Sequence, residues 1–417
     1  MSATVIIRGG LVLAHADAVP ALLDVQVVDG RITAVGRPGM AAPAGARAID
    51  ARGRILIPGL INAHTHSHGA LMKGCGDCWN LELLLNAGPW ITGHRTAGDK
   101  ALSTKLCAVE SLLKGCTTVY DLFVEFPVPT PEGAVAVGEA FSSVGMRAVV
   151  APMLADRSFY QAIPGLMDAL PAQQRDAVGK FRYAPGEANL EACRQALKDW
   201  PLDRDHVRFA MAPTIPLHCA DEFMVAAARM ARDFDTGFHT HLAESKVQAV
   251  AGRERYGRTL TAHLDALGIL GPNFTAAHAV WLDSDDARRM GDKGASVAHN
   301  PGSNMRLGSG IAPARDFLGA GVNVGIGTDG AHCSDNQNMF EAMRLAAFAS
   351  RVRGPRYEQW LTTREVFRMA TEASAKALGF GGRLGRIETG YLADIVFLDR
   401  TSVNLVPLND LVNQLVL

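Results

Sequence analysis

The chain has 417 residues, 48% of them hydrophobic, and its 41 Lys and Arg residues nearly balance 42 Asp and Glu residues, for a formal net charge of -1. This length allows a large buried core, and we expect one large domain with a small one. The near-neutral charge provides no field that attracts polyanions or acidic membranes, which argues against nucleic-acid and membrane partners. The seven cysteines are scattered, the N-terminus does not resemble a signal peptide, and no apolar run reaches the roughly 18 residues of a membrane span. These features predict a soluble, cytoplasmic protein.

Short β-branched runs near the beginning of the chain predict a small sheet. They cover residues 4–13, 22–36 and 48–59 and are broken by Gly-Gly and Asp-Gly pairs, which are typical of hairpin turns. A similar run at 385–400 follows a glycine-marked turn, so we expect it to return and pair with the first module. The sequence therefore predicts a small antiparallel β-sandwich domain made from residues 1–57 and 387–417.

Between these ends, short apolar runs alternate with polar loops and stretches of helical periodicity. Such alternation predicts parallel strands joined by crossover helices. The runs number eight, which indicates an α/β fold with a (β/α)8 TIM-type barrel over residues 58–386. The eight runs cover residues 58–66, 116–123, 146–153, 207–214, 237–244, 274–282, 295–301 and 322–330.

Histidines and carboxylates stand where these runs end, and the ends of barrel strands are where catalytic groups gather. His64 and His66 are two residues apart, so in a strand their imidazoles face the same side and can bind one ion. A lone His-x-His pair is equally consistent with hydrogen-bonded strand histidines. A second pair, His239 and His241, and a Thr-Asp-Gly motif that ends in Asp329 and Gly330 favour the metal interpretation, with His241 a better ligand than His239.

Several segments together resemble the amidohydrolase superfamily, specifically its cytosine deaminase-like branch. That branch includes S-adenosylhomocysteine deaminases, guanine deaminases and s-triazine hydrolases. The resemblance spans nearly the whole chain and rests on PGLINAHTH, HTHLAES, AAHAVWL, AHNPGSNMRLGSGIAP and GTDGAHCSDNQNMFEAMRLA, in this order.

The resemblance implies one divalent metal ion per subunit, Zn or Fe, bound by His64, His66, His241 and Asp329. It implies that His278 orients the attacking water, that Glu244 carries protons to the leaving group and a ring nitrogen, and that Asp329 accepts a proton. Binuclear relatives carry a carboxylated lysine at the fourth strand, where this chain reads RFAMAPTIP without lysine. One metal is therefore expected.

The substrate contacts are less specific. Many deaminases of this branch have histidine after Ala-Pro at the fourth strand, where this chain has Thr214, and that departure weakens an adenosine-type assignment. Two tryptophans in the loop after the first strand are candidate stacking surfaces, and the segment from His299 to Asn304 resembles one that shapes the pocket floor. Packing residues, surface salt bridges and surface-loop histidines remain alternative interpretations. The candidate substrate-binding residues are Trp79, Trp90, Arg157, Thr214, His218 and Asn304.

The leading hypothesis is a hydrolytic deaminase of a purine, pyrimidine, pterin or triazine that releases ammonia. One alternative keeps the same site but displaces chloride or opens a cyclic amide, and another is a metal-binding barrel without catalysis. The resemblance also implies a homodimer. Family members continue past a segment like LADIVFLD with more strands, so we expect either that the chain is truncated or that the small domain is incomplete, which would expose an edge strand.

Overall fold

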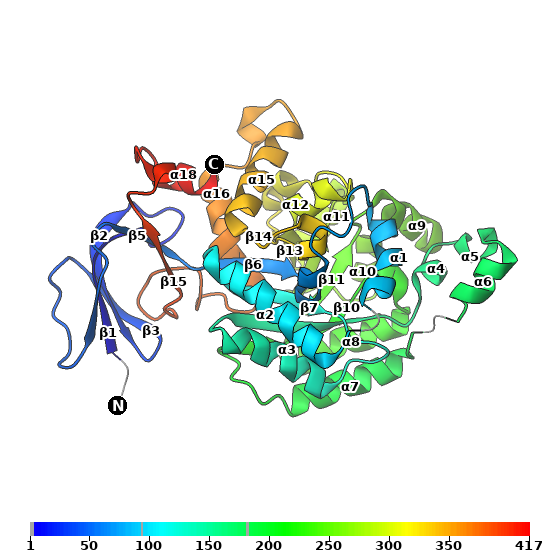
Figure 1. Ribbon diagram of the computed structural model, residues 1–417. Helices are drawn as coiled ribbons and strands as arrows, with labels where there is room; N and C mark the ends of the chain where they lie inside the picture. Colours follow the sequence, from blue (N-terminus) through cyan, green and yellow to red (C-terminus); the bar gives the residue numbers. More distant parts are fainter. Residues whose placement is uncertain (1–3, 93–94, 181–182) are drawn as a thin grey trace.

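The computed structural model describes residues 4–92, 95–180 and 183–417, and it consists of a small sheet beside a larger α/β body (Figure 1). The small sheet has six strands in the order β15-β5-β1-β2-β3, with β4 beside β1. The turn between β2 and β3 is Asp29-Gly30, and both residues have positive φ (48° and 76°), as a tight two-residue hairpin requires. The strands are β1 (Thr4–Val12), β2 (Ala21–Val28), β3 (Arg31–Gly36), β4 (Arg47–Asp50), β5 (Arg54–Pro58) and β15 (Ile395–Asp399).

The two ends of the chain meet in this sheet, as the sequence predicts. Strand β15 pairs antiparallel with β5, from Ile395 opposite Pro58 to Asp399 opposite Arg54. The expectation of a purely antiparallel sheet is wrong, because β1 pairs in parallel with both β4 and β5. The physical reason is that the chain crosses over between β3 and β4 instead of turning back in another hairpin, so β4 and β5 run in the direction of β1.

The larger body contains two parallel sheets, and each of the eight predicted runs contains strand structure. One sheet has the order β10-β8-β7-β6 with β9 also beside β8, and the other has the order β11-β12-β13-β14. Nearly every residue of these strands is buried, as expected where helices cover a parallel sheet. The strands are β6 (Leu60–Thr65), β7 (Cys116–Phe123), β8 (Arg147–Leu154), β9 (Val207–Phe209), β10 (Ala212–Pro213), β11 (Phe238–Leu242), β12 (Phe274–His278), β13 (Ser296–His299) and β14 (Asn323–Ile326).

The two parallel sheets adjoin at both edges. At one edge Met211 bridges to Phe238 in parallel, and the His241 amide donates to the Thr214 carbonyl oxygen at 2.8 Å. At the other edge the Asp329 amide donates to the His64 carbonyl oxygen at 2.9 Å. These contacts bring the ends of β6, β10, β11 and β14 to one region, where the candidate ligands lie.

Helices surround the parallel strands (Figure 1). Many begin at a side-chain cap, as at Thr96, Thr130 and Asp283. The helices that follow or flank the first four strands are α1 (Leu81–Thr92), α2 (Ala97–Leu113), α3 (Pro131–Ser143), α4 (Phe159–Ala162), α5 (Leu166–Ala169), α6 (Ala172–Val178), α7 (Gly186–Lys198) and α8 (Asp221–Asp233), with short turns η1 (Ser67–Met72) and η2 (Pro216–His218). Those of the second half are α9 (Lys246–Tyr256), α10 (Leu260–Ala266), α11 (Ser284–Asp292), α12 (Pro301–Arg306), α13 (Ala314–Gly319), α14 (Ala331–Ser334), α15 (Met339–Val352), η3 (Tyr357–Gln359), α16 (Thr363–Arg368), η4 (Met369–Ala373), α17 (Ser374–Ala377), η5 (Val403–Leu405) and α18 (Leu411–Val416).

The last helix packs against the large body. The Thr363 hydroxyl of α16 donates to Asn413 Oδ1 of α18 at 2.5 Å, and Leu411, Val412 and Leu415 join the main hydrophobic core. After β15, the C-terminal segment therefore leaves the small sheet. Within the described residues, every helix is too short or too polar to cross a membrane.

Candidate metal centre

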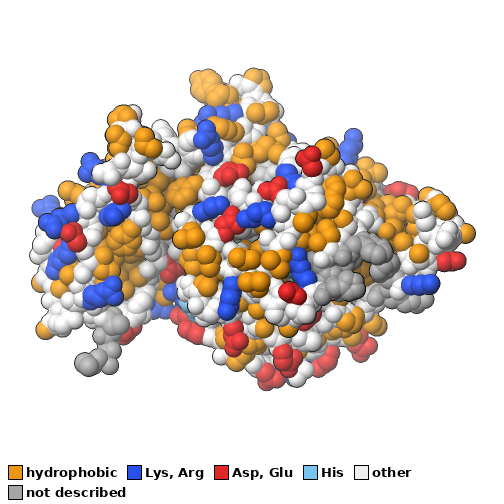
Figure 2. Space-filling view, viewed as in Figure 1, with side chains coloured by type: hydrophobic (Ala, Val, Ile, Leu, Met, Phe, Trp, Pro, Cys, Tyr) orange, Lys and Arg blue, Asp and Glu red, His pale blue; other side chains and the backbone are white. Residues whose placement is uncertain are grey.

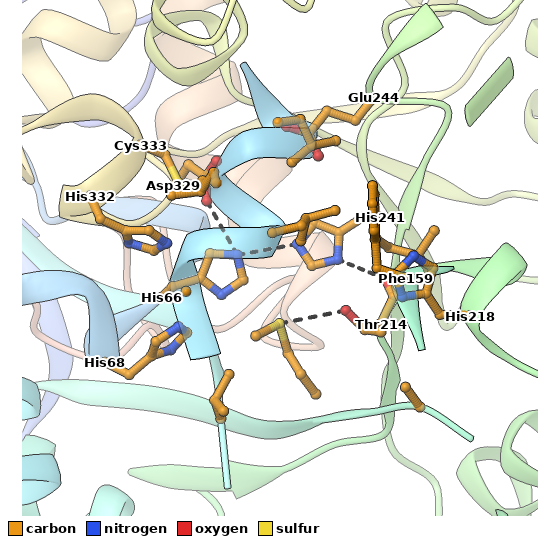
Figure 3. Close-up of a pocket in the computed structure, with 18 of the residues that line it drawn as sticks. His66, His68, Phe159, Thr214, His218, His241, Glu244, Asp329, His332 and Cys333 are labelled. Carbon is orange, nitrogen blue, oxygen red and sulfur yellow. Dashed lines mark hydrogen bonds and ion pairs between the residues drawn. The ribbon is translucent and has the colours of Figure 1, made fainter. Parts of the chain in front are cut away.

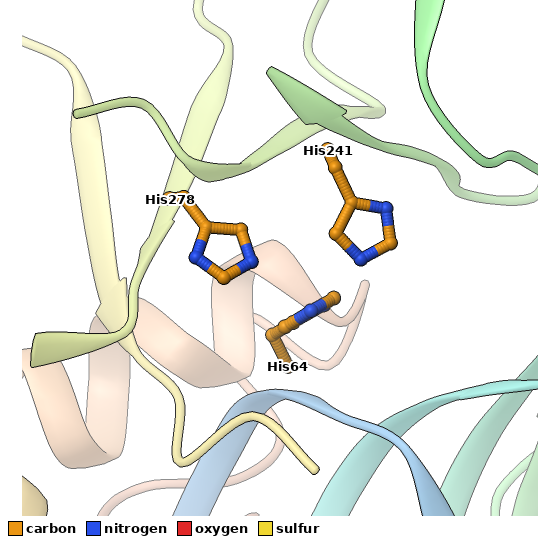
Figure 4. A group of neighbouring side chains, drawn as sticks. All are labelled: His64, His241 and His278. Atoms are coloured by element: carbon orange, nitrogen blue, oxygen red, sulfur yellow. The ribbon is translucent and has the colours of Figure 1, made fainter. Parts of the chain in front are cut away.

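Four strand ends place the candidate ligands around one point. His64 belongs to β6, and His66 follows that strand directly. His241 belongs to β11, which pairs with β12 so that Leu242 lies opposite His278. Asp329 follows β14. All of these side chains are buried, with exposed fractions between 0 and 6%. In Figure 4 the rings of His64, His241 and His278 converge from different elements.

Hydrogen bonds fix which nitrogen of His66 and His241 faces the centre. His66 Nδ1 lies 2.7 Å from the Leu122 carbonyl oxygen, and His241 Nδ1 lies 2.6 Å from the Thr214 carbonyl oxygen. A carbonyl only accepts, so both Nδ1 atoms carry the proton, and in the neutral rings both Nε2 atoms are acceptors. These two Nε2 atoms are 3.1 Å apart. Two lone pairs at that distance repel each other unless a cation binds between them.

His64 and Asp329 complete the same cluster. His64 Nε2 is buried and has no hydrogen-bond partner, and His64 Nδ1 lies 3.2 Å from His239 Nε2. Asp329 Oδ1 lies 3.6 Å from His64 Nε2 and 3.2 Å from His66 Nε2. His239 therefore contacts a candidate ligand from behind, while Asp329 faces two candidate ligands directly.

The carboxylate of Asp329 is held in its ionised form. Burial alone would raise its pKa, but the positive charges that His66 and His278 can carry, together with a hydrogen bond from Ser303, lower the pKa below its usual value. Ser303 Oγ donates to Oδ2 at 2.5 Å, and the Gly330 amide donates to Oδ1 at 2.7 Å. An anionic oxygen among neutral imidazoles is a donor set that suits Zn²⁺ or Fe²⁺.

The pKa of Glu244 shifts in the opposite direction. Burial raises the pKa well above the usual range, and the nearby carboxylates of Asp329 and Glu82 raise it further. Its Oε2 lies 3.6 Å from His278 Nε2. Two carboxyl groups in one site thus have pKa values shifted in opposite directions, which is the arrangement expected of a proton donor beside a metal ligand.

His278 is oriented by its second nitrogen. Its Nδ1 lies 2.9 Å from Asn304 Oδ1, and its Nε2 lies 3.8 Å from Asp329 Oδ2 with no hydrogen-bond partner of its own. Burial lowers the pKa of His278, so the ring is neutral near neutral pH and its Nε2 accepts. The backbone is left-handed at both His278 (φ 68°) and Asp329 (φ 63°), a strained conformation that often occurs at functional sites.

A network that sequence reasoning did not predict supports the ligands. Asp121 accepts from the Ser67 amide at 2.6 Å and from the Ser67 hydroxyl at 2.7 Å, which fixes the chain just after His66. Gln337 Nε2 donates to the Asp329 carbonyl oxygen at 2.8 Å. Neither residue stands in a metal-ligand spacing, so its role becomes visible only through these contacts.

A cavity of about 160 Å³ opens onto the cluster. Figure 3 shows Thr214, His218 and Phe159 on one side of His241 and His332 and His68 on the other side of His66. Apolar residues from η1, α1 and neighbouring strands complete the lining, which suits a flat ring. They are Met72, Leu81, Leu84, Leu85, Val124, Phe126, Met153, Ala155 and Ile215.

The structure separates the predicted substrate contacts into two groups. Thr214 and His218 line the cavity, and His218 is buried although a surface-loop position was one interpretation. Trp79 packs with Leu81, Leu84 and Leu307 behind the cavity wall, and Arg157 donates to the Cys219 carbonyl oxygen at 3.2 Å. Asn304 contacts His278. Among the described lining residues, Trp79, Arg157 and Asn304 are absent.

Trp90 belongs to α1, and its side chain lies outside the described residues.

His68 and His332 line the cavity but were not predicted as site residues. Their ring centroids are 5.5 Å apart, and each has a buried Nδ1 without a hydrogen-bond partner. His332 packs so closely on Gly69 that a Cβ there would lie 1.9 Å from its Nδ1. The sequence signal that could have found His332 is its place in the GTDGAHCSDNQNMFEAMRLA segment, three residues after Asp329.

These contacts fit one divalent metal ion better than a hydrogen-bonded polar core. Three overlapping groups of His and acidic side chains have ligand atoms within 4.8 Å of one another, and together they contain His64, His66, His241, His278, Glu244 and Asp329. The unpartnered His64 Nε2 and the facing acceptors of His66 and His241 would be costly if no cation bound them.

Known proteins are similar to this chain in fold and in sequence over nearly its full length. The chain is 33% identical over 401 residues to 5-methylthioadenosine/S-adenosylhomocysteine deaminase of Syntrophobacter fumaroxidans. This alignment covers 94% of the chain and 83% of the relative. It is 30% identical to the solved structure of zinc-complexed atrazine chlorohydrolase TrzN from Arthrobacter aurescens TC1, with a TM-score of 0.86 and coverage of 99% and 91%. A zinc-bound adenosine deaminase from Xanthomonas campestris is 27% identical, with a TM-score of 0.86 and coverage of 99% and 89%. The sequence pattern named "Amidohydrolase family" matches residues 55–416. The chain therefore belongs to the amidohydrolase family.

Proposed function

We propose that this protein is a hydrolytic deaminase of a nitrogen heterocycle. The observation that carries the proposal is the position of the buried Glu244 carboxyl group beside His278, with Oε2 and Nε2 3.6 Å apart, next to Asp329 and two imidazole acceptors that face each other. A proton donor and a metal-binding cluster in one cavity are what removal of an amine requires, because an amide anion does not leave unprotonated. The relatives named as deaminases support this reaction class.

We assign one divalent ion, Zn or Fe, to His64, His66, His241 and Asp329. The tautomers of His66 and His241, the unpartnered His64 Nε2 and the ionised carboxylate support this ligand set. When bound, such an ion supplies Lewis-acid chemistry that makes water a nucleophile near neutral pH. The same donor set accepts either metal.

The protein's own residues then align water and move protons. His278, held by Asn304 through Nδ1, presents an Nε2 acceptor that aligns the attacking water. Asp329 accepts a proton through Oδ2, the oxygen that lies 3.8 Å from His278 Nε2. Glu244 donates its proton to a ring nitrogen as water adds and then passes the proton of the added hydroxyl to the amine, so that the C–N bond breaks and ammonia leaves. The proton that Asp329 took from water then returns to Glu244. Thr214 and His218 contact the substrate from the cavity wall, and Leu84 and Phe126 pack on its faces.

A second candidate reaction is displacement of chloride from a triazine ring. It is supported by the 30% identity to atrazine chlorohydrolase, and it uses the same residues to activate water. A panel assay separates the two. The full-length protein, purified without chelator, is analysed for metal and incubated with 5-methylthioadenosine, guanine, cytosine, a pterin and atrazine while ammonia and chloride are measured. Ammonia release supports deamination, and chloride release without ammonia supports the second candidate. No product together with no stoichiometric metal leaves the non-catalytic barrel as the better explanation.

We also propose the finer architecture. The two adjoining parallel sheets form one closed (β/α)8 barrel over residues 58–386, and residues 1–57 with the returning segment from residue 387 through β15 form a β-sandwich-type domain, while α18 packs against the barrel. The hydrogen bonds at both sheet edges and the pairing of β15 with β5 support this division. We further propose a cytoplasmic homodimer; all seven cysteines are free thiols, which is compatible with a reducing compartment.

A further inference from the structure

Helix α2 exposes four large aliphatic side chains and buries three hydroxyl-bearing ones. Leu102, Leu106, Val109 and Leu113 are 51%, 45%, 42% and 83% exposed. Its buried residues are Ser103, Thr104, Cys107, Ala108 and Ser111. A surface helix normally has the reverse pattern, with its apolar stripe facing the core. Figure 2 shows hydrophobic side chains gathered on the front of the molecule, where α2 lies in Figure 1.

The buried polar face has a structural reason, because it holds the segment that follows ligand His66. Ser103 Oγ donates to the Ser67 carbonyl oxygen at 2.8 Å, and Thr104 Oγ1 lies 3.1 Å from Ser67 Oγ. Ser67 in turn binds Asp121 through its amide and hydroxyl. These contacts account for the inward face of α2, but the described contacts give no reason for leucines on its outward face.

From this face we infer that α2 forms the centre of a twofold interface with a second copy of the chain. The four aliphatic residues are spaced by four, three and four positions, which is the spacing of an apolar seam between two helices. The stripe is also symmetric about its own midpoint. If two α2 helices pack antiparallel around a twofold axis there, Leu102 faces Leu113 of the second copy and Leu106 faces Val109. A surface that matches itself in this way specifies a second copy of the chain as its partner.

Charge also fits the antiparallel register. Lys105 is exposed beside the stripe, and the same symmetry places it opposite Glu110 of the second copy instead of opposite its own counterpart. Glu110 already binds Lys73 and Lys114 at 2.5 and 2.7 Å, so a further ion pair adds little affinity. The benefit lies in avoiding a Lys105–Lys105 contact at the centre, because like charges that meet across an interface are unfavourable.

The apolar area of α2 is comparable to the largest apolar patch of a typical monomer, but it is smaller than a stable interface. The four side chains expose on the order of 400 Å² together, which approaches the largest apolar patch of a typical monomer. A standard interface buries roughly 800 Å² on each partner, so neighbouring segments must contribute. Two exposed apolar residues stand next to groups that are tied to α2. Leu71 is 39% exposed and lies two residues before Lys73, which binds Glu110 of α2. Phe126 is 51% exposed and directly follows Glu125.

The interface would connect with the candidate metal centre through the same residues. Lys100 of α2 binds Glu125 at 3.3 Å, and the adjacent Phe126 lines the cavity. On the inward side, α2 holds Ser67 next to ligand His66. This inference gives a position to the homodimer proposed above, but it does not depend on the reaction that the site performs.

Sedimentation velocity of the full-length metal-loaded protein at micromolar concentration tests the interface. We expect the wild type to sediment as a dimer of about 89 kDa, twice the chain mass of 44.4 kDa. Leu106→Lys combined with Val109→Lys places charges at the centre, and Leu113→Lys changes an end position whose 83% exposure makes a folding defect unexpected. Both variants should weaken the dimer at least tenfold. Val225→Lys on α8, where the side chain is 37% exposed, is the matched control and should remain dimeric.

Circular dichroism and metal content verify that each variant folds. A wild-type protein that sediments at 44.4 kDa at all concentrations overturns the inference and leaves the α2 face to a different partner. A wild-type dimer that persists in the folded Leu113→Lys and double variants also overturns it, because the dimer then uses another face. These results are independent of ammonia release, so failure of the interface and failure of the proposed reaction are distinguishable.

Discussion

Replacement of Glu244 by glutamine tests the proton-transfer role with little disturbance of packing. The side chain is 2% exposed, and glutamine has nearly the same size and shape, so the variant should fold and bind metal as the wild type does. It cannot donate a proton to a ring nitrogen or an amine. A positioned general acid contributes about 10²–10⁴ in rate, which corresponds to about 3–5 kcal/mol of activation free energy. We expect turnover to fall by at least about a hundredfold.

The pH profile provides a second readout. Glu244 acts while protonated, and burial raises its pKa, so the alkaline limb of wild-type turnover should fall as pH rises through that pKa. Glu82→Gln is the matched control, because its carboxylate raises the pKa of Glu244 and accepts a hydrogen bond from Ser245 at 2.7 Å. That variant should keep the plateau turnover but shift the alkaline limb to lower pH.

Steady-state kinetics across pH, with metal analysis of each variant, measure both effects. Full turnover in metal-loaded Glu244→Gln would refute the assignment of Glu244 as proton donor. If the alkaline limb is unchanged in Glu82→Gln, the limb reports the titration of a group other than Glu244.

Three further outcomes follow from the structure. His64→Ala should lose metal and activity together, which elemental analysis and the ammonia assay measure; full metal retention would contradict its ligand role. Asp24→Ala should destabilise the fold by about 2–4 kcal/mol in urea, because Arg8 and the amides of Gly9, Gly39 and Met40 lose the acceptor they share, whereas the exposed Asp50→Ala should leave stability unchanged. Hydrogen bonds from Arg8 and three amides outweigh burial and lower the pKa of Asp24, so its contribution is present above the unfolded pKa of 3.8 and is lost as pH falls through the folded pKa. Gly291→Ala should destabilise by at least about 1–3 kcal/mol, since overpacking carries that cost and the new Cβ would lie 1.9 Å from a backbone oxygen, while Gly319→Ala, with no atom within 4 Å, should not.

The strands of the large body were predictable because their signal is local. Each is a short apolar run between polar or glycine-containing loops, and β7 matches its run from Cys116 to Phe123. The run at 207–214 was less well predicted, since it divides into β9 and β10. Met211, between them, bridges to Phe238 on the neighbouring sheet, and this tertiary contact has no counterpart in the local pattern.

The candidate ligands were predictable for a similar reason. His64 and His66 are two residues apart in a strand, and His239 and His241 repeat that spacing. The spacing alone therefore shows that the two imidazoles of each pair face the same side. His68 and His332 are far apart in sequence, and only the fold brings their rings to 5.5 Å. Trp79 shows the converse, because its type suggested ring stacking, whereas in the structure it packs against the cluster of Leu81, Leu84, Leu307 and Cys333 and does not line the cavity.

Helix α2 shows a further limit of periodicity. Its apolar residues recur at helical spacing over the observed helix, Ala97–Leu113. Periodicity gives the angle between residues but not the side that faces the core. That side is decided by Ser103 and Thr104, whose hydroxyls reach Ser67 next to a metal-ligand candidate. Because unsatisfied polar atoms at Ser67 would cost more than a partly exposed leucine stripe, the helix turns its polar face inward, and a second copy of the chain can then cover the leucines.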